Sequence, residues 1–172
     1  MEMLRCCDGP NILKTNRKIA VINTPSIIKI ATEMAVDRDK CMFCRIYDGK
    51  ERNDIYFQDE DFVVFEDHKP AAKHHLLIVT KEHIPNAKAL TKQQKNIAQR
   101  LMELGRQMLL ERGGDITDAR YGYHWPPFNS INHLHLHAIS PASTMTFLNK
   151  SIFKESSWWF VSPEYVVDRL SE

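Results

Sequence analysis

The segment Asn132-His133-Leu134-His135-Leu136-His137-Ala138-Ile139 decides the fold of this chain. Its alternation of histidines with apolar residues is typical of a β-strand, in which successive side chains point to opposite faces. The three imidazoles therefore share one face, roughly 6.5 to 7 Å apart along the backbone, and the apolar residues face the core. Because buried imidazoles need hydrogen-bond partners, the histidine face must line a cleft or contact specific polar groups.

Such a row of histidines suits two kinds of chemistry. A neutral imidazole is a nucleophile near pH 7, so one ring can attack phosphorus while neighbouring N–H groups stabilise negative charge. A His-x-His pair on a strand can instead hold a metal ion. The triplet alone leaves both readings open, whereas a chance run is disfavoured in a chain with only 8 histidines.

The segments around this strand predict an α+β fold. Thr91 and Gln94 have capping-box spacing before apolar residues that recur at helical spacing over 97–108, and Gly113 follows this helix. Ser162-Pro163 can start a terminal helix. Short apolar runs between turn residues read as further strands, namely 55–57, 62–65, 75–79, 120–124 and 158–161. Hairpins with one long helix predict an antiparallel sheet that is covered on one face.

Length and composition bound the class of protein. We expect a folded domain over residues 38–172 and a poorly ordered or loosely packed tail over residues 1–37. A net charge of +1 gives no electrostatic case for nucleic acid or a membrane surface as partner. The most apolar early stretch, 19–36, is interrupted by Pro25, Lys29 and Glu33 and is not expected to span a bilayer.

No signal-peptide pattern precedes the four cysteines. We therefore expect reduced thiols and a location in the cytoplasm and nucleus. The basic residues of the tail resemble a mitochondrial presequence weakly, which makes the mitochondrion the lesser alternative.

Four segments together resemble the histidine triad superfamily. The triad strand 133–139 matches its signature of three histidines, each followed by an apolar residue. Phe65-Glu66-Asp67-His68-Lys69-Pro70 is similar to its nucleoside-binding strand and turn, and 75–84 to the strand and lysine-rich turn that follow. The loop 127–132 stands where the family has its phosphate-proximal loop. The Pro126-Pro127-Phe128 approach and Trp158-Trp159-Phe160 most resemble the third-paralogue branch of the nucleotide-binding members.

The resemblance implies a five-stranded antiparallel sheet with a long covering helix, usually in a homodimer or larger homo-oligomer. It implies purine nucleotide substrates in which AMP is joined to an amine. The expected reaction is hydrolysis of adenosine 5′-phosphoramidate and of adenylated amines, and also of acyl- and lysyl-adenylates, to AMP. The intermediate would be a nucleotidyl-histidine, and no cofactor would be required for catalysis.

The resemblance also assigns roles to residues. His135 matches the nucleophile, His137 the residue that contacts the α-phosphate, and His133 the residue that orients the array. Ser130 is expected to donate toward the phosphate or the departing amine. The residues expected to bind the nucleotide, besides the catalytic ones, are Asp67 at the ribose, Phe65, His68 and Ile46 beside the base, His75 as the additional histidine, and Asn129 in the phosphate loop. This loop reads Phe128-Asn129-Ser130 where glycine-rich forms are frequent, so backbone N–H groups have less room to approach phosphate.

Cys41-x-x-Cys44 is a weak metal motif by itself. In some histidine triad members this pair binds zinc together with two histidines, which here match His83 and His133. The sequence therefore predicts either a structural zinc site of these four residues or two thiols without a metal. His124 and Trp125, before the Pro-Pro turn, are expected in loop packing or at a dimer edge.

Three alternatives to a phosphoramidase stay open. The first is a DNA 5′-adenylate hydrolase similar to aprataxin, and the second is a nucleotide-binding regulatory protein with little turnover. The third is a hydrolase with a catalytic metal on the triad, which the ribose-binding segment at Asp67 argues against.

Overall fold

The computed structural model describes residues 38–172. The tail predicted over residues 1–37 lies outside the described residues, and the predicted division of the chain stays a prediction. None of the helices within 38–172 is long and apolar enough to cross a membrane.

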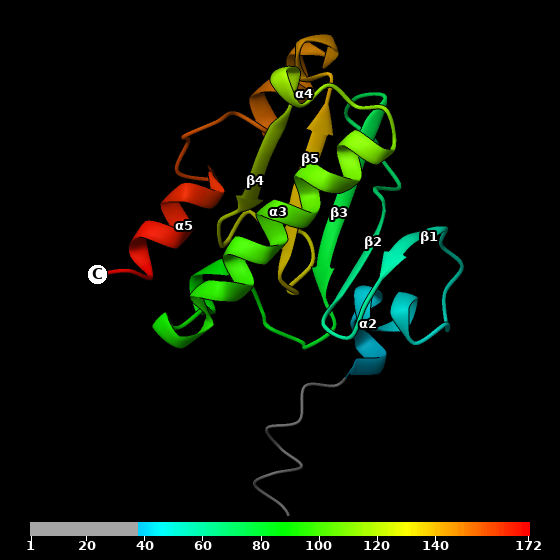
Figure 1. The fold of residues 1–172 in the computed structure, drawn as a ribbon, viewed down its shortest axis with the longest axis vertical. Helices are drawn as coiled ribbons and strands as arrows, with labels where there is room; N and C mark the ends of the chain where they lie inside the picture. Colours follow the sequence, from blue (N-terminus) through cyan, green and yellow to red (C-terminus); the bar gives the residue numbers. More distant parts are fainter. Residues whose placement is uncertain (1–37) are drawn as a thin grey trace, which may run out of the picture. The chain divides into compact units, whose positions relative to one another are not determined.

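Six antiparallel strands form one sheet in the order β1-β2-β3-β5-β4-β6 (Figure 1). The strands are β1 (Ile55–Gln58), β2 (Phe62–Glu66), β3 (His74–Thr80), β4 (Arg120–His124), β5 (His135–Ser140) and β6 (Phe160–Val161). The α+β class and the antiparallel sheet are confirmed, but the expected count of five strands is one too low. The sixth strand arises because Phe160 and Val161 return along the outer edge of β4 and pair with His124 and Tyr123.

Helix α3 (Lys95–Glu111) crosses one face of the sheet (Figure 1). A 3₁₀ turn, Lys92–Gln94, precedes it, and there the backbone N–H of Thr91 donates to Gln94 Oε1 at 3.1 Å, which confirms the predicted cap. A Cβ at Gly105 would lie 3.3 Å from Leu136 Cδ2, so glycine lets this helix approach the triad strand closely. Helix α5 (Pro163–Arg169), capped by Ser162 as predicted, contacts α3.

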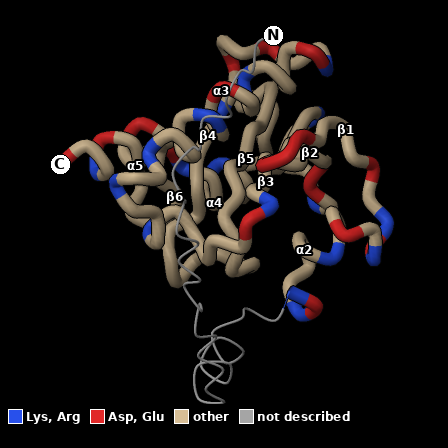
Figure 2. The backbone as a smooth tube through the Cα atoms, turned by 60° about the horizontal axis from the view of Figure 1, so that its bottom comes forward, with Lys and Arg blue, Asp and Glu red and all other residues tan. Residues whose placement is uncertain are grey.

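The opposite face of the sheet carries two short helices. Helix α2 (Met42–Tyr47) packs Phe43 and Ile46 against Phe65 and other strand residues that alternate with those facing α3. Helix α4 (Phe147–Ile152) lies at the other end of the sheet (Figure 1), and the residues after it bring Phe153 into a cluster with Ile139 and Phe160. Helix α2 and the residues after α4 thus place the histidine face between two apolar clusters. Basic and acidic residues are interspersed along the chain (Figure 2).

Strand β5 begins at His135, two residues later than predicted. The backbone of Leu134 pairs outside the regular ladder, because its N–H donates to the carbonyl of Ile84 at 2.6 Å and its carbonyl accepts from Thr80 N–H at 3.4 Å. His133 consequently precedes the strand, and its ring lies next to the turn that follows β3.

Candidate active site

The triad histidines are all buried on the face opposite α3. Leu134, Leu136 and Ala138, which alternate with them, belong to the core beneath that helix. The predicted division of the segment into a histidine face and an apolar face is therefore confirmed.

A backbone carbonyl sets the tautomer of His135. Its Nδ1 lies 2.6 Å from the carbonyl oxygen of His133. A carbonyl can only accept, so Nδ1 carries the proton and the lone pair of the neutral ring is on Nε2. Burial lowers the pKa of His135, although the carbonyl of His133 and the charge of Asp67 oppose this shift. The ring is therefore neutral at neutral pH, with a proton on Nδ1 and a free lone pair on Nε2.

A second chain of hydrogen bonds sets the tautomer of His137. The N–H of Ala71 donates to Nδ1 of His75 at 3.1 Å, so the neutral His75 ring carries its proton on Nε2. That nitrogen lies 2.9 Å from Nδ1 of His137 and donates to it. The proton of a neutral His137 is then on Nε2, a buried atom without a partner among the described residues. His137 thus presents an N–H donor to whatever occupies the site.

Burial keeps this chain of rings neutral. It lowers the pKa of His75 to about 4, although Asp67 opposes the shift. It lowers the pKa of His137 well below the usual value, and the charges of His135 and His75 add to the effect. The Oδ2 atom of Asp67 lies 3.6 Å from His75 Nε2 and 4.0 Å from His137 Nδ1, close enough to stabilise positive charge on the row.

Asp67, His75 and His137 could in principle hold a metal ion, since their ligand atoms lie within 4.8 Å of one another. The 2.9 Å between the two ring nitrogens is a hydrogen-bond distance. Two nitrogens on one tetrahedral metal ion would lie roughly 3.3 Å apart. The spacing therefore favours the hydrogen-bonded chain over a catalytic metal.

A cavity of about 890 Å³ opens over this face, with walls on both sides of β5. Of the predicted site residues, those that line it are Ile46, Phe65, Asp67, His68, Ser130 and His137. His75, His135 and Asn129 do not line it. His75 lies beneath His137, and the Asn129 side chain points to the carbonyl of Ile131 and to Asn132 at 3.4 Å each.

The rings of Phe43 and His137, which line the cavity, lie next to His135, and 8% of the surface of His135 is exposed. Its ring centroid is 4.9 Å from that of His137 and 5.0 Å from that of Phe43, both edge to face. The proposed nucleophile is thus held between a triad neighbour and helix α2, and Phe43 shields one side of it from solvent.

Sequence reasoning missed several residues of the cavity wall, among them Met42, Phe43, His124 and Phe153. Phe43 was treated as a spacer in the Cys-x-x-Cys motif, although it and Ile46 are three positions apart and so share a helix face. His124 was expected in loop packing or at a dimer edge, but its ring centroid lies 4.9 Å from that of His137. The alternation of β4 could have indicated this, because Gly122 pairs with His137 and shares a face with His124.

A second cluster joins the start of the domain to the triad. Its members are Cys41, Cys44, His83 and His133, whose ligand atoms lie within 4.8 Å of one another. Nδ1 of His133 lies 3.2 Å from Cys41 Sγ and 3.6 Å from Cys44 Sγ, and Nδ1 of His83 lies 3.4 Å from Cys44 Sγ. Ligand atoms of a tetrahedral zinc site lie roughly 3.3 to 3.8 Å apart. The predicted four residues therefore form a group that could hold a metal ion and is compatible with structural zinc.

The tautomer of His133 also fits a metal ligand. Its Nε2 lies 2.6 Å from the carbonyl oxygen of Thr80 and donates to it, so Nδ1 faces the thiols without a proton. Burial lowers the pKa of His133 to about 4, so the ring is neutral near pH 7.

Comparisons with known proteins agree with this geometry. The family model described as "Scavenger mRNA decapping enzyme C-term binding" matches residues 40–153. The adenosine 5′-monophosphoramidase HINT3 of Mus musculus is 42% identical over 134 residues, which cover 76% of this chain and 81% of that protein. The HINT3 protein of Xenopus tropicalis is 40% identical over 132 residues, which cover 76% and 86%.

Among solved structures, a HIT family hydrolase from Clostridium thermocellum superposes with a TM-score of 0.58 at 25% identity. The superposition covers 63% of this chain and 96% of that one. The chain therefore belongs to the histidine triad superfamily and, within it, to the family of the scavenger mRNA decapping enzyme C-terminal binding domain.

Proposed function

We propose that this protein hydrolyses the P–N bond of adenosine 5′-phosphoramidate and of adenylated amines, and releases AMP through a nucleotidyl intermediate on His135. The observation that carries the proposal is the hydrogen-bond pattern of two adjacent neutral rings. One ring offers a lone pair on Nε2 and the next offers an N–H group. The HINT3 relatives, which are named adenosine 5′-monophosphoramidases, support the same reaction.

The proposed reaction has two steps. In the first, Nε2 of His135 forms a bond to phosphorus while the P–N bond breaks, and the amine nitrogen keeps the electron pair of that bond and takes up one proton from solvent. In the second, a water oxygen bonds to phosphorus, the bond to His135 breaks with its electron pair returning to Nε2, and the water gives up one proton to solvent, which leaves AMP and the neutral ring. In both steps the Nε2–H of His137 donates to a non-bridging oxygen, where negative charge is concentrated.

The nucleotide would lie in the cavity with its nucleoside over β2 and β3. Asp67 accepts hydrogen bonds from the ribose hydroxyls, and Phe65, Ile46 and His68 flank the base. Ser130 donates toward the phosphate or the amine, with Asn129 beside it in the loop. Support comes from the cavity walls, because all of these residues except Asn129 line the cavity.

We further propose that the Cys41, Cys44, His83 and His133 group binds a structural zinc ion. The tetrahedral spacing of the ligand atoms and the tautomer of His133 support this. Such an ion would tie the residues before β1 to the triad, because His133 is shared. The proposed catalytic steps use no cofactor, so we expect AMP release without added Mg²⁺.

The homodimer and the location in cytoplasm and nucleus stay proposals that rest on the sequence. Light scattering coupled to size-exclusion chromatography measures the first, and imaging of the tagged full chain measures the second.

The test of the proposed function is to quench the protein in acid during turnover of adenosine 5′-phosphoramidate and to map the nucleotide by mass spectrometry. We expect AMP release and an adduct on His135. The His135→Ala variant should lose both, while His74→Ala, a change on the other face of β3, should keep both. Full activity of His135→Ala would refute the nucleophile.

The same assay separates the alternatives. Turnover of nicked 5′-adenylated DNA alone would favour the reading similar to aprataxin, and a single turnover with tight AMP binding would favour a regulatory protein.

A further inference from the structure

The cluster of Cys41, Cys44, His83 and His133, which we call the thiol cluster, borders a cavity of its own. This cavity of about 430 Å³ is the thiol-side cavity, and its lining residues are Lys40, Cys41, Met42, His83, Ser130, Ile131 and Asn132. Cys41 is therefore in the wall, whereas Cys44 does not line the cavity. Cys41 keeps 8% of its surface exposed and Cys44 keeps none. The two thiols of the cluster thus differ in their access to solvent.

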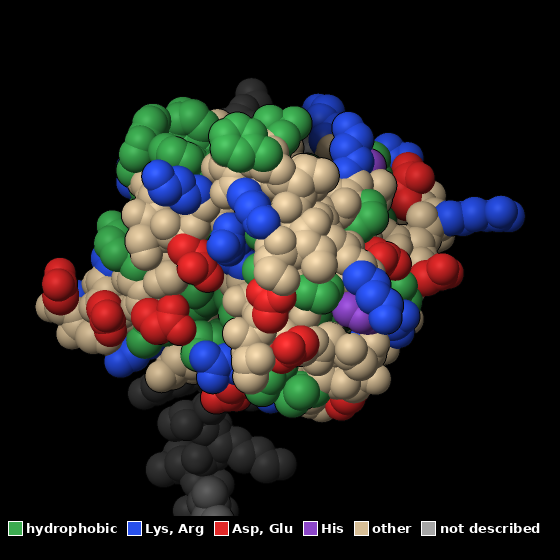
Figure 3. Space-filling view, turned by 90° about the horizontal axis from the view of Figure 1, so that it is seen from above, with side chains coloured by type: hydrophobic (Ala, Val, Ile, Leu, Met, Phe, Trp, Pro, Cys, Tyr) green, Lys and Arg blue, Asp and Glu red, His purple; other side chains and the backbone are tan. Residues whose placement is uncertain are grey.

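The lining of the thiol-side cavity differs from the surface at the α4 end of the molecule. Four of its seven lining residues have a polar or charged side chain. At the α4 end, Phe147, Leu148 and Trp158 are exposed. Figure 3, which views the molecule from that end, shows hydrophobic side chains gathered along one edge. The polar groups of the thiol-side cavity suit a small polar molecule rather than an apolar one.

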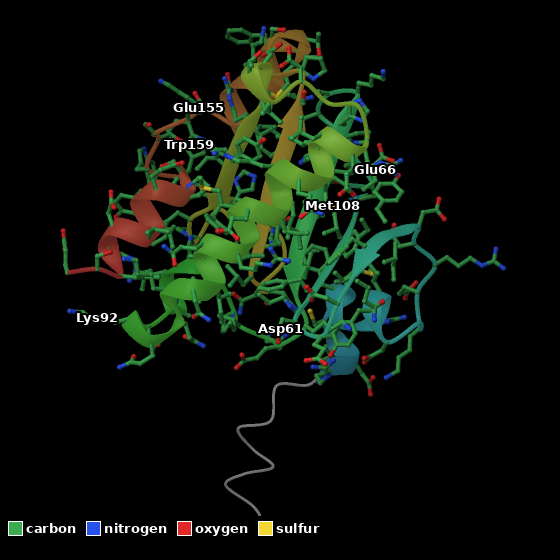
Figure 4. The ribbon with its side chains drawn as sticks, viewed as in Figure 1. Asp61, Glu66, Lys92, Met108, Glu155 and Trp159 are labelled. Atoms are coloured by element: carbon green, nitrogen blue, oxygen red, sulfur yellow. The ribbon has the colours of Figure 1, made fainter. Side chains whose placement is uncertain are left out.

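Helix α2 places the two thiols next to each other. It lies at the end of the sheet where Asp61 is labelled in Figure 4. Cys41 directly precedes the helix and Cys44 is three positions further on, and the N–H of Arg45 donates to the carbonyl of Cys41 at 3.0 Å, which closes the turn. The ligand atoms of the cluster, including both sulfurs, lie within 4.8 Å of one another. Nδ1 of His133 is 3.2 Å from one sulfur and 3.6 Å from the other.

This placement is compatible with a disulfide bond. Residues three apart in a helical turn have Cα atoms roughly 5 Å apart, and the Cα atoms of bonded cysteines lie about 4.4 to 6.8 Å apart. Both cysteines are reduced in the structure. A bond between their sulfurs therefore requires rotation of two side chains and leaves the backbone of α2 in place.

We infer that Cys41 is a site of oxidation by hydroperoxides, and that Cys44 captures the oxidised sulfur of Cys41 in a disulfide bond. The thiol-side cavity admits the small polar oxidant to the wall that contains Cys41, and the second thiol waits behind it at the correct spacing. The loss of zinc that follows rests on the proposed structural zinc site, whereas the oxidation of the thiols does not.

The oxidation has two steps. In the first, the thiolate sulfur of Cys41 bonds to one oxygen of hydrogen peroxide, the O–O bond breaks, and the departing oxygen takes up a proton, which gives a sulfenic acid and water. In the second, the thiolate sulfur of Cys44 bonds to the sulfur of Cys41, the S–O bond breaks, and hydroxide leaves and takes up a proton. The two sulfurs together lose two electrons, which reduce the peroxide to water.

The disulfide removes half of the proposed zinc ligands. Zinc binds deprotonated thiols, and the sulfurs of a disulfide carry no negative charge. Only His83 and His133 then remain as ligands, so the thiol cluster should lose its zinc on oxidation.

The test treats the reduced, zinc-loaded full chain with hydrogen peroxide. Cys6 and Cys7 are changed to serine, so that Cys41 and Cys44 are the only thiols that remain. We expect peptide mapping to find a disulfide between Cys41 and Cys44, and a chromogenic chelator to detect one released zinc ion for each disulfide formed. Dithiothreitol with added zinc should reverse both changes. Thiols that stay reduced under peroxide would overturn the inference.

A matched pair of variants tests which sulfur reacts first. Dimedone, which labels sulfenic acids, should label Cys41 in Cys44→Ser at least about tenfold faster than it labels Cys44 in Cys41→Ser, because only Cys41 lines the cavity. Each variant lacks one thiol, so loss of zinc affects both alike. Brief labelling of the chain that keeps both thiols makes the same comparison without either substitution. Equal labelling of the two sulfurs would overturn Cys41 as the site.

The outcomes separate this inference from the earlier proposals. A reduced protein without zinc would remove the proposed structural ion, and peptide mapping would still decide whether the disulfide forms. Zinc that stays bound while both thiols stay reduced would overturn the oxidation site alone. Sulfonic acid on Cys41 without a disulfide would overturn the role of Cys44. None of these measurements depends on AMP release, so they are independent of the proposed reaction.

Discussion

His133 and His137 stand two positions before and two positions after His135, yet they have different partners. His133 donates its Nε2 proton to the carbonyl of Thr80 and turns Nδ1 to the thiols of Cys41 and Cys44. His137 accepts at Nδ1 from His75 and turns Nε2–H to the cavity. The comparison shows that the second partner of an imidazole, rather than its place in the motif, decides whether it offers a lone pair or a proton.

The rings at the two ends of the histidine row share one property, a pKa that burial lowers. Burial lowers the pKa of His133 to about 4 and that of His137 well below the usual value, so both rings are neutral near pH 7. They differ in the groups opposite them. Soft thiols face the lone pair of His133, which suits zinc, whereas the N–H of His137 faces a cavity, where it can donate to an anionic oxygen.

The largest expected effect is at the cavity end. His137→Ala removes the N–H group that we propose donates to the phosphate, and loss of one such donor costs about 10²- to 10³-fold in kcat. Zinc content should not change, because His137 is outside the thiol cluster. Steady-state kinetics and metal analysis measure the two effects, with His74→Ala as the control. A kcat within about fivefold of the unmodified value would break the comparison.

At the thiol end we expect a loss of stability that exceeds the loss of turnover. Cys44→Ala removes a buried thiol of the proposed zinc site, so bound zinc should fall below detection and Tm should fall by about 10 °C or more. Chelator should lower the Tm of the unmodified protein but not that of the variant. If the chelator lowers both equally, the ion is bound elsewhere.

A smaller effect is expected at His75, which acts through His137. His75→Ala removes the donor that holds the proton of His137 on Nε2, and we expect kcat to fall about tenfold with little change in KM. His75→Gln keeps an N–H donor on a side chain of similar reach and should recover part of kcat. Loss of stability with unchanged kcat would instead show a packing role only.

The smallest expected effect is that of pH on turnover. Since burial lowers the pKa of His135 and His137 below 6.5, kcat should change less than about twofold between pH 8 and pH 6.5.

Below pH 6.5 the free energy of unfolding should fall, because unfolded histidines bind protons that folded His75 and His124, with pKa values of about 4, do not. This loss should continue to about pH 4. Thermal unfolding at stepped pH measures it, and a constant Tm would contradict it.

Much of the fold could be predicted because its signals are local. The alternation around His135 and the helical spacing from Ile97 to Met108 repeat at the periods of a strand and a helix, and Thr91 and Ser162 cap helices from within their own turn. The three triad histidines were predicted from their alternation, whereas Asp67, His75 and the thiol cluster were predicted by resemblance. The apolar run 158–161 was read as a strand, but the five-stranded sheet implied by the resemblance did not include it, because its pairing with β4 spans a connection that contains β5 and α4.

The sequence by itself determined which residues carry the chemistry, because three histidines on one strand face follow from the period of the backbone alone. Only the tertiary structure decided what each histidine does. The partners that set the tautomers of His133 and His137 are Thr80 and His75, which are 53 and 62 residues away along the chain. Phe43 beside His135 and His124 beside His137 likewise come from other elements. Such contacts depend on how strands and helices pack together, which no local pattern specifies.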